Sequence, residues 1–377
     1  MDFLLTDEQQ EIAGLVARIL GEQVTPERLR AVEDTAEPVF DRRLWSTLAD
    51  AGLLGVAIPA EHGGLGFGLT ELCLVLEEAG RTVAPVPLLA TLVGGALPVA
   101  RFGTETQRTT ILPPIAAGER IVTAALVEPE SADVLRPATT ARRDGDGWVL
   151  SGHKTCVPAG LFADTVLVSA ATPDGTVGLF LVEAAARGVT RRPQRTISDA
   201  TEASVDLDGV AVGDDAVVGP IDAASTVIGW LADRLTAGVC SLLVGVTEAA
   251  LRLTAEYVTT RQQFGRPLAG FQAVGQRAAD AFIDAWSIRL ATLQAVWALD
   301  TGLPVAKELA VAKLYAAEAG QRVARAAQHL HGGVGMDRDY PLHRYTLTAK
   351  QLELTLGGGG RHVEALGRLL ADECATA

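Results

Sequence analysis

The stretch of the sequence with the clearest chemical potential is centred on Arg261, between two long helical patterns. Apolar residues recur at helical spacing up to Tyr257, and a turn containing Gly265, Pro267 and Gly270 then separates one predicted helix from the next. An arginine in the last turn of a helix, beside the backbone N–H groups that open the following helix, could bind a phosphate group. The simpler alternative is a basic helical hairpin without a ligand.

The motif extends well beyond this arginine. From Tyr257 to Gln272 the sequence reads Tyr-x-x-x-Arg-x-x-Phe-Gly-x-Pro-x-x-x-Phe-Gln, which resembles the signature of the acyl-CoA dehydrogenase family. The resemblance implies that Arg261 and Phe264 reach an FAD that is bound mainly by a neighbouring subunit. It also implies that Gln272 lies near the nucleotide part of that FAD.

A second stretch, from Gln328 to Gly335, predicts a helix that ends on the paired glycines Gly332 and Gly333. Paired glycines let a cofactor approach the backbone closely, although a simple helix C-cap is the alternative. The spacing Gln-x-x-x-Gly-Gly is similar to that of the family, which implies that Gln328, Gly332 and Gly333 touch the neighbour's FAD. We predict no metal site, because the nearby histidines have no carboxylate or cysteine at metal-ligand spacing and are interpreted as structural: His329, His331 and His343.

The family's reaction removes a proton from the acyl α-carbon with a carboxylate, while hydride leaves the β-carbon for the flavin. By resemblance, the base would fall at Leu356 or, in another branch of the family, at Leu235, with Leu242 two turns further on the same helix face. All three positions are apolar. Asp233 is close in sequence, but at about 100° per residue it points away from Leu235, so we interpret it as a solvated surface residue. The chain is therefore predicted to have no catalytic residue.

The β-rich segment departs from the family as well. Family members carry a Thr-Glu-Pro-Gly-x-Gly-Ser-Asp motif whose Thr and Ser bond the flavin and its pyrophosphate, and Val127 and Asp133 stand at these two positions. A carboxylate where phosphates would lie is repulsive. In the family's Lys-x-Trp-Ile-Thr-Asn element, Cys156 replaces the stacking Trp and Pro158, which has no donor, replaces the hydroxyl partner of flavin N5. The motifs that reach a neighbour's site are intact, whereas those for this chain's own flavin are lost.

The order of the hydrophobic patterns predicts a protein that is mainly α-helical with a central β-domain. Helical patterns occupy residues 1–120 and 220–377, and short β-branched runs between Gly and Asp turns occupy residues 121–219. We expect an N-terminal helical domain that begins with a cap at Thr6, a small antiparallel β-domain and a C-terminal helical bundle. This is the order of the acyl-CoA dehydrogenase fold, so the resemblance covers essentially the whole chain.

Composition limits the partners and the location that we expect. The 377 residues are 48% hydrophobic and carry a net charge of −14, which argues against nucleic acid or an anionic membrane as partner but allows a local basic site. The four cysteines form no Cys-x-x-Cys pair and the first residues lack the basic stretch of a signal peptide, so we expect a reduced, cytoplasmic protein. The apolar run from Val83 to Ala100 is broken by prolines and glycines and is not expected to span a membrane.

The pattern of kept and lost motifs leads to a functional prediction. The chain resembles the FAD-clamping, non-catalytic partner subunit of actinobacterial heterotetrameric acyl-CoA dehydrogenases that degrade sterol side chains. The resemblance implies an α2β2 assembly that dehydrogenates an acyl-CoA thioester at its α,β-bond and passes electrons to an electron-transfer flavoprotein. A sister subunit would supply the base, the acyl-CoA pocket and most flavin contacts. Two alternatives stay open: a self-sufficient homotetramer with a displaced base such as Asp233, and a structural or regulatory protein that has lost flavin.

Overall fold

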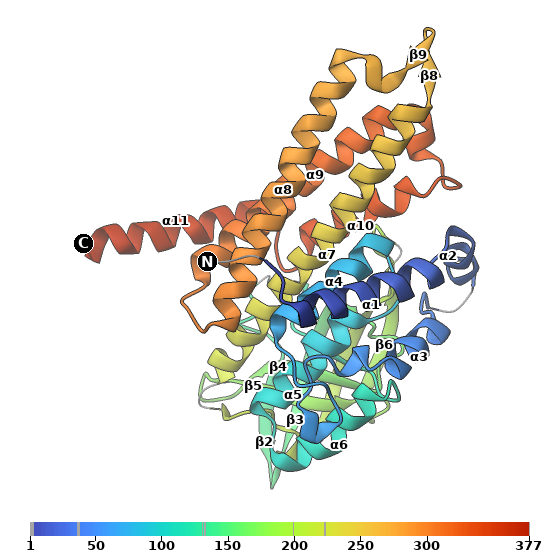
Figure 1. The fold of residues 1–377 in the computed structure, drawn as a ribbon. Coiled ribbons are helices and arrows are strands. Elements are labelled where there is room, and N and C mark those ends of the chain that lie inside the picture. Colours follow the sequence, from blue (N-terminus) through green and yellow to red (C-terminus); the bar gives the residue numbers. More distant parts are fainter. Residues whose placement is uncertain are drawn as a thin grey trace. The chain divides into compact units, whose positions relative to one another are not determined.

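The computed structural model describes residues 4–35, 38–129, 131, 133–198, 200–221 and 224–376. The chain divides into two compact units (Figure 1). The first combines residues 1–28, 69–84 and 236–377, and the second combines residues 29–68 and 85–235. The helical, β and helical order of elements expected from the sequence is confirmed. The domain boundaries near residues 120 and 220 stay predictions.

The first unit is built from helices. Its first helix, α1, begins at a Thr6 cap as expected, with a capping box between Thr6 and Gln9. Helix α9 packs against α8, α10 and α11. The bounds are α1 Asp7–Gln23, α4 Leu69–Thr82, the later part of α7 (Ala224–Thr260), α8 Gln272–Asp300, α9 Ala306–His331, α10 Leu342–Leu354 and α11 Gly359–Thr376.

Helices α4 and α7 cross in direct backbone contact at two glycines. A Cβ atom on Gly80 would overlap the carbonyl oxygen of Leu242, and a Cβ atom on Gly245 would overlap that of Glu77. Two helices approach this closely only where side chains are absent, because any side chain would occupy the place of the facing main chain. The glycine crossing therefore fixes which residues of α4 and α7 face each other.

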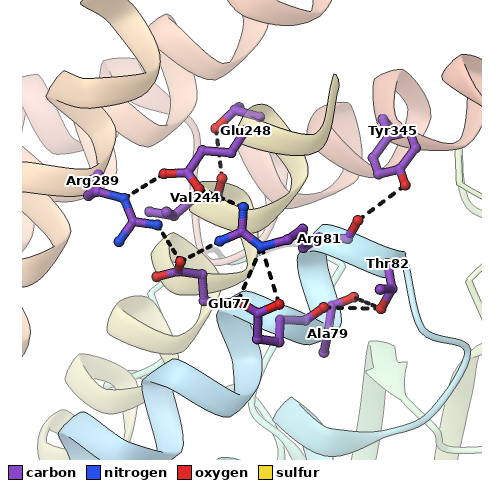
Figure 2. Close-up of polar contacts among 10 residues, drawn as sticks. Glu77, Ala79, Arg81, Thr82, Val244, Glu248, Arg289 and Tyr345 are labelled. Atoms are coloured by element: carbon purple, nitrogen blue, oxygen red, sulfur yellow. Dashed lines mark hydrogen bonds and ion pairs between the residues drawn. The ribbon is translucent and has the colours of Figure 1, made fainter. Parts of the chain in front are cut away.

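A cluster of charged side chains lies beside this crossing (Figure 2): Glu77, Glu78, Arg81, Glu248 and Arg289. Arg81 donates to Glu77 at 2.7 Å and to Glu248 at 2.6 Å, and Arg289 of α8 donates to the same two carboxylates. Burial raises the pKa of Glu77, although Arg289 opposes the shift. For Glu248, burial also acts to raise the pKa, but hydrogen bonds from the two arginines bring it below its ordinary value. Glu77 and Glu248 each have two cationic partners and Glu78 pairs with Arg81 at 3.1 Å, so the cluster joins α4, α7 and α8 without leaving an isolated charge.

The second unit contains a seven-stranded sheet and several short helices. The strand order is β1-β4-β2-β3-β7-β6, with β5 also paired to β4. The strands are β1 Val122–Ala125, β2 Thr140–Asp144, β3 Gly147–Pro158, β4 Thr165–Ala171, β5 Val177–Glu183, β6 Val189–Gln194 and β7 Glu202–Gly213. The helices are α3 Arg42–Asp50, a π-helical stretch Leu89–Ala96, α5 Leu97–Phe102 and α6 Glu105–Ala116, while α2 Pro26–Glu33 runs across the boundary between the units.

The sheet is mixed, whereas the sequence predicted a small antiparallel β-domain. Strand β1 pairs in parallel with β4, with Val122 opposite Thr165, while the ladders of β2 with β3, β3 with β7, β4 with β5 and β6 with β7 are antiparallel. A parallel pair needs a long crossover, and the chain between β1 and β4 contains the whole β2–β3 hairpin. Alternating hydrophobicity identifies strands but not their direction, which explains the error.

Among the described residues, one helix is apolar and long enough to cross a membrane by composition alone. This segment, Ser225–Thr260, has a mean hydropathy of 1.5 over its most apolar window, and 61% of that window is buried inside the protein. Its residue Gly245 lies in the backbone crossing with α4. The apolar surface of α7 is therefore used for packing within the chain.

We expect Gly245→Ala to destabilise the chain by about 1–3 kcal/mol, because the new methyl group would displace the backbone of α4. Gly14→Ala on the exposed side of α1 is the control, since nothing lies within 4 Å of an added Cβ there. Alanine in that helix should stabilise by about 0.5–1 kcal/mol. Urea denaturation followed by circular dichroism measures both variants, and equal midpoints for Gly245→Ala and wild type would show that the crossing tolerates a side chain.

Candidate functional site

The stretch around Arg261 forms a tight reverse turn that follows the end of α7 (Figure 1). Strand β8 (Gln262–Gln263) pairs with β9 (Arg266–Pro267), and Phe264 and Gly265 between them have φ values of 54° and 77°. A two-residue hairpin of this type needs positive φ at both central residues. A left-handed phenylalanine costs on the order of 1–3 kcal/mol in strain. The side chain of Phe264 is nevertheless 91% exposed, so a strained residue holds an aromatic ring in solvent.

Arg261 follows α7 directly, and its backbone N–H donates to the carbonyl of Tyr257 at 2.8 Å. The guanidinium is exposed and makes no hydrogen bond or ion pair to any residue that the structure describes, and the same holds for the side chain of Gln272. Residues 257–279 contain three arginines and no acidic residue, although the whole chain has a net charge of −14. A locally positive segment with free donors fits a ligand that carries phosphate.

The predicted glycine turn after α9 is also present. Helix α9 ends at His331, and Gly332 has a φ of 63°, which a residue with a side chain rarely adopts. Gly332 and Gly333 are exposed, and nothing lies within 4 Å of a Cβ atom added to either one. One turn earlier, Gln328 donates from Nε2 to Sδ of Met336 at 3.3 Å, a weak bond that a better acceptor could replace.

An aromatic stack joins these two motifs, which are far apart in the sequence. The ring of Tyr257 stacks on His331 with 4.4 Å between centroids. Nδ1 of His331 donates to the carbonyl of Ala327 at 2.8 Å, so Nε2 is left to accept the hydroxyl of Tyr340 at 3.0 Å. Burial lowers the pKa of His331, which favours this neutral form. The structural interpretation of His331 is therefore supported, and within the described residues no group of side chains could hold a metal ion.

Sequence reasoning missed this stack. The available signal was position alone, because Tyr257 lies one helical turn before Arg261 and His331 directly precedes Gly332. Nothing in the spacing of either motif indicates that the two segments meet. The stack brings the predicted residues of both motifs into one region of the first unit.

Large apolar side chains in the same two segments are exposed. Phe264 lies in the hairpin, and Val334 and Met336 follow the glycine turn, where they are 40% and 69% exposed. Isolated apolar residues on a surface need no explanation, but apolar groups beside unpaired polar ones are typical of a binding surface. This part of the first unit therefore has the chemistry of an interface.

The loop after α10 contains Leu356, the first of the two positions at which the family resemblance places the base. Leu356 is half-buried and has a φ of 59°. Directly before it, the buried amino group of Lys313 donates to the carbonyls of Leu352 and Glu353 at 2.8 and 2.9 Å, and burial lowers the pKa of Lys313 to about 8. The carboxylate of Glu353 is paired with Lys350 at 2.9 Å. The loop is firmly anchored at its start, but it has no carboxylate at the expected position.

On α7, the structure differs from the prediction at one residue, Asp233. Leu235 and Leu242 are half-buried and apolar, as expected. Asp233 was predicted to be a solvated surface residue, and this is wrong, because it is half-buried and burial raises its pKa against the opposing charge of Arg234. A helical wheel gives the direction of a side chain around α7 but not the neighbours that cover that direction. The carboxylate of Asp233 accepts no hydrogen bond from the described part of the chain.

The four altered positions in the second unit offer little to a flavin. Val127 has no hydroxyl, and the carboxylate of Asp133 accepts a backbone N–H of its own turn at 3.1 Å and pairs with Arg136 at 3.8 Å. Cys156 is exposed in a left-handed conformation with a φ of 50°. Pro158 has no N–H, and its carbonyl accepts a threonine hydroxyl at 2.6 Å. The hydroxyl and amide donors that the family pattern requires are therefore absent at these described positions.

A buried ion pair holds together the backbone segments that carry these altered positions. The buried amino group of Lys154 donates to buried Glu128 at 2.7 Å and to Ser169 at 3.1 Å. Burial acts to raise the pKa of Glu128, but hydrogen bonds from Lys154 and Thr139 hold it at about 2. This ion pair ties together the segments of Val127 and Cys156, so the two segments stay in place although their side chains have changed.

Comparison with known proteins identifies the family. Domain models of the acyl-CoA dehydrogenase family match residues 6–119 as the N-terminal domain, residues 123–209 as the middle domain and residues 229–370 as the C-terminal domain. The chain is a member of the acyl-CoA dehydrogenase family. The resemblance read from the Arg261 and Gln328 motifs and the expected three-domain fold are thereby confirmed.

Individual acyl-CoA dehydrogenases match along almost the whole chain. Acyl-CoA dehydrogenase FadE27 of Mycobacterium tuberculosis (strain ATCC 25618 / H37Rv) is 40% identical over 380 residues, which cover 99% of both chains. A chain of the ChsE4-ChsE5 complex from Mycobacterium tuberculosis has a TM-score of 0.93 at 40% identity, with coverage of 98% of this chain and 99% of that chain. A chain of a variant of the Tcur3481-Tcur3483 steroid ACAD has a TM-score of 0.91 at 44% identity, with the same coverage.

Acyl-CoA dehydrogenases use FAD, and the residues of this chain fit that cofactor unevenly. In the first unit, the unpaired donors of Arg261 and Gln272 fit its phosphates and nucleotide part. In the second unit, Val127, Asp133 and Pro158 offer no donor to the flavin and place a carboxylate where its pyrophosphate would lie. The donors that fit FAD therefore lie in the first unit, and the altered positions lie in the second.

We expect Arg261→Ala to lower the FAD affinity of the assembled enzyme about ten- to hundredfold, since a charge-assisted bond to phosphate contributes about 1.5–3 kcal/mol. The thermal stability of the isolated chain should not change, because the guanidinium bonds to none of the described residues. Arg18→Ala, at an exposed position of α1, controls for the loss of charge. FAD titration measures the affinity, and thermal unfolding measures the stability of the chain. An unchanged FAD affinity would show that Arg261 does not bind the cofactor.

Proposed function

We propose that this chain is the FAD-clamping, non-catalytic subunit of a heteromeric acyl-CoA dehydrogenase. The observation that carries the proposal is an asymmetry. Arg261 and Gln272 extend into solvent without side-chain partners in the described chain, and Phe264 is exposed beside them with only an edge contact to Phe271. Leu356 and Pro158 stand where a base and a hydroxyl donor are needed. Free donors beside exposed apolar rings suit a surface that another subunit covers. An apolar residue at the position of the base cannot accept the α-proton.

In this proposal, the residues of this chain bind and orient FAD. FAD, when bound, supplies the hydride acceptor for α,β-dehydrogenation of an acyl-CoA thioester. Arg261 binds the cofactor's diphosphate, Phe264 packs against the cofactor and Gln272 orients its nucleotide part. Gln328 and the exposed backbone of Gly332–Gly333 contact it from the second motif. Removal of the α-proton belongs to the sister subunit.

The two motifs are held together before any partner arrives. Tyr257 stacks on His331, and His331 is fixed in turn by Ala327 and Tyr340. A binding site works best when the supporting residues lock the residues that touch the ligand. This chain therefore offers the sister subunit a surface with its contacts already spaced, which reduces the ordering cost of assembly.

The sister subunit supplies the base, the acyl-CoA pocket and most contacts to FAD in an α2β2 assembly. Two solved relatives support this part of the proposal: one is a ChsE4-ChsE5 complex and the other a steroid ACAD with two named components. On the same basis we propose a steroid side-chain CoA thioester as the substrate class. Electrons then pass to an electron-transfer flavoprotein in the cytoplasm.

One observation favours a second candidate, a self-sufficient homotetramer with Asp233 as the base. Burial raises the pKa of this carboxylate, which is a property of general bases, and no described residue bonds to it. The third possibility, a flavin-free structural protein, leaves the unpaired donors of Arg261 and Gln272 without a role. The two experiments below separate these three possibilities.

Expressed alone, the chain should hold little FAD and show no acyl-CoA dehydrogenase activity, because Val127, Asp133 and Pro158 replace flavin partners. Co-expression with its sister subunit should yield a yellow complex. The ratio of flavin absorbance to protein, together with turnover of a steroid side-chain CoA, measures both. Stoichiometric FAD and turnover in the chain alone would favour the homotetramer, and a complex without flavin would favour the structural protein.

Asp233→Asn should leave the activity of the complex nearly intact if the working carboxylate belongs to the sister subunit. A general base contributes typically about 10²–10⁴-fold in rate, so the two candidates differ by far more than assay error. Asp146→Asn, at an exposed position, is the matched control for the amide substitution. A loss of that size at normal FAD content would make this chain catalytic.

A further inference from the structure

Four polar side chains lie together on one face of the sheet in the second unit, where β6, β7 and β3 run side by side. His153 of β3 lies directly opposite Asp206 of β7, and Arg192 of β6 lies directly opposite Ser204 of β7. Val205, between Ser204 and Asp206, is buried in the core. Because side chains alternate along a strand, the four polar residues share the other face, where they are half-buried or exposed.

Three of these residues are connected in the order of a serine hydrolase triad. Nδ1 of His153 lies 2.5 Å from Oδ1 of Asp206, and Nε2 lies 3.5 Å from Oγ of Ser204. An ionised carboxylate only accepts hydrogen bonds, so Nδ1 carries the proton and Nε2 presents its lone pair to the hydroxyl. This is the arrangement in which a histidine takes the proton of an attacking serine. A nucleophile and its base are commonly this far apart before a substrate binds.

A shift in strand register is what brings His153 and Asp206 together. The pairing of β3 with β7 shifts by one residue just before His153 and shifts back just after Lys154. Without the first shift, His153 would lie opposite Leu207, whose side chain is buried in the core. Bulges of this kind are frequent next to active sites, where they redirect a side chain. The local irregularity of the sheet therefore serves this group of residues.

Arg192 places a positive charge beside the serine. Side chains that face each other across two strands have Cβ atoms about 4.5–5.5 Å apart, which applies to Arg192 and Ser204. Nη2 of Arg192 donates to Asp206, and its other N–H groups have no partner among the described residues. A free cationic donor at this position would stabilise the negative oxygen that forms when a serine attacks an acyl carbonyl.

We propose that Ser204, His153, Asp206 and Arg192 form a second reaction site, which hydrolyses esters or thioesters of short acyl groups. Oγ of Ser204 attacks the carbonyl carbon while Nε2 of His153 takes its proton. The bond from that carbon to the leaving oxygen or sulfur then breaks, and His153 returns the proton to the leaving group. A water molecule, deprotonated by the same histidine, releases the carboxylic acid and restores the serine.

The openness of the site limits its substrates. The side chains of Asp206, His153 and Arg192 are 30%, 39% and 62% exposed, so the sheet face offers no wall against which a long acyl chain could pack. All four residues belong to the second unit, whereas the residues that fit FAD belong to the first. The hydrolysis therefore goes beyond the proposed function and needs neither FAD nor a sister subunit.

A fluorophosphonate probe tests the nucleophile directly in the full chain. The probe forms a bond between its phosphorus and the serine oxygen while fluoride leaves, and peptide mass spectrometry locates the adduct. We expect labelling of Ser204, and His153→Gln should slow it by at least about a hundredfold, since a general base contributes about 10²–10⁴-fold. Ser151→Ala, at an exposed serine of β3, is the matched control and should label as wild type does. No adduct on Ser204, or equally fast labelling of His153→Gln, would overturn the proposal.

Hydrolysis of p-nitrophenyl acetate tests the complete site. Ser204→Ala and His153→Gln should reduce the rate to that of the uncatalysed reaction. Arg192→Gln should lower kcat at least about tenfold with little change in KM, because the charge that it stabilises exists only in the transition state. Asp206→Asn should lower kcat, and Asp206→Glu should recover part of the loss.

Circular dichroism confirms that each variant is folded. Hydrolysis that survives Ser204→Ala would contradict the site, and so would equal rates for wild type and Arg192→Gln. Both assays use the chain without FAD or acyl-CoA, so their outcome is independent of the proposed function.

Discussion

The backbone contact between α4 and α7 is the constraint on which the first unit depends. With glycine at positions 80 and 245, no side chain separates the two helices, and their register cannot slide without a collision of main chains. Glu77 takes part twice, with its carbonyl at the crossing and its carboxylate in the charged cluster. The cluster then extends the constraint to α8 through Arg289. Three helices are thus fixed relative to one another by contacts that tolerate little substitution.

These contacts also determine where the hairpin lies. From Gly245, α7 continues for about 22 Å to its end at Thr260, and α8 returns from the hairpin to the cluster at Arg289. Helices α7 and α8, which carry the hairpin, are joined by the ion pair of Glu248 with Arg289, and α7 is joined to α9 nearer the hairpin by the stack of Tyr257 on His331. A small shift at the crossing would become a larger one at Arg261. Rigid support far from the site is therefore part of how the site is positioned.

Much of the fold and part of the site could be predicted from the sequence. The helix ends at Arg261 and Gly332 were predictable because glycine, proline and arginine act locally at helix ends. The parallel pairing of β1 with β4 was not, because strand direction is decided by chain crossover rather than by local pattern. The half-buried state of Asp233 and the stack of Tyr257 on His331 were missed for a similar reason. Both depend on neighbours that are distant in the sequence. The left-handed Phe264 could be suspected only from the glycine beside it.

The strained, exposed Phe264 has a consequence for the life of the chain before assembly. A newly made copy presents this ring, the side chain of Val334 and the thioether of Met336 to water at the same time. Chaperones and proteases recognise such groups, so a copy whose apolar surface stays uncovered is exposed to them. For the heteromer proposed above, synthesis of the two chains in matched amounts would then be a physical requirement of this surface.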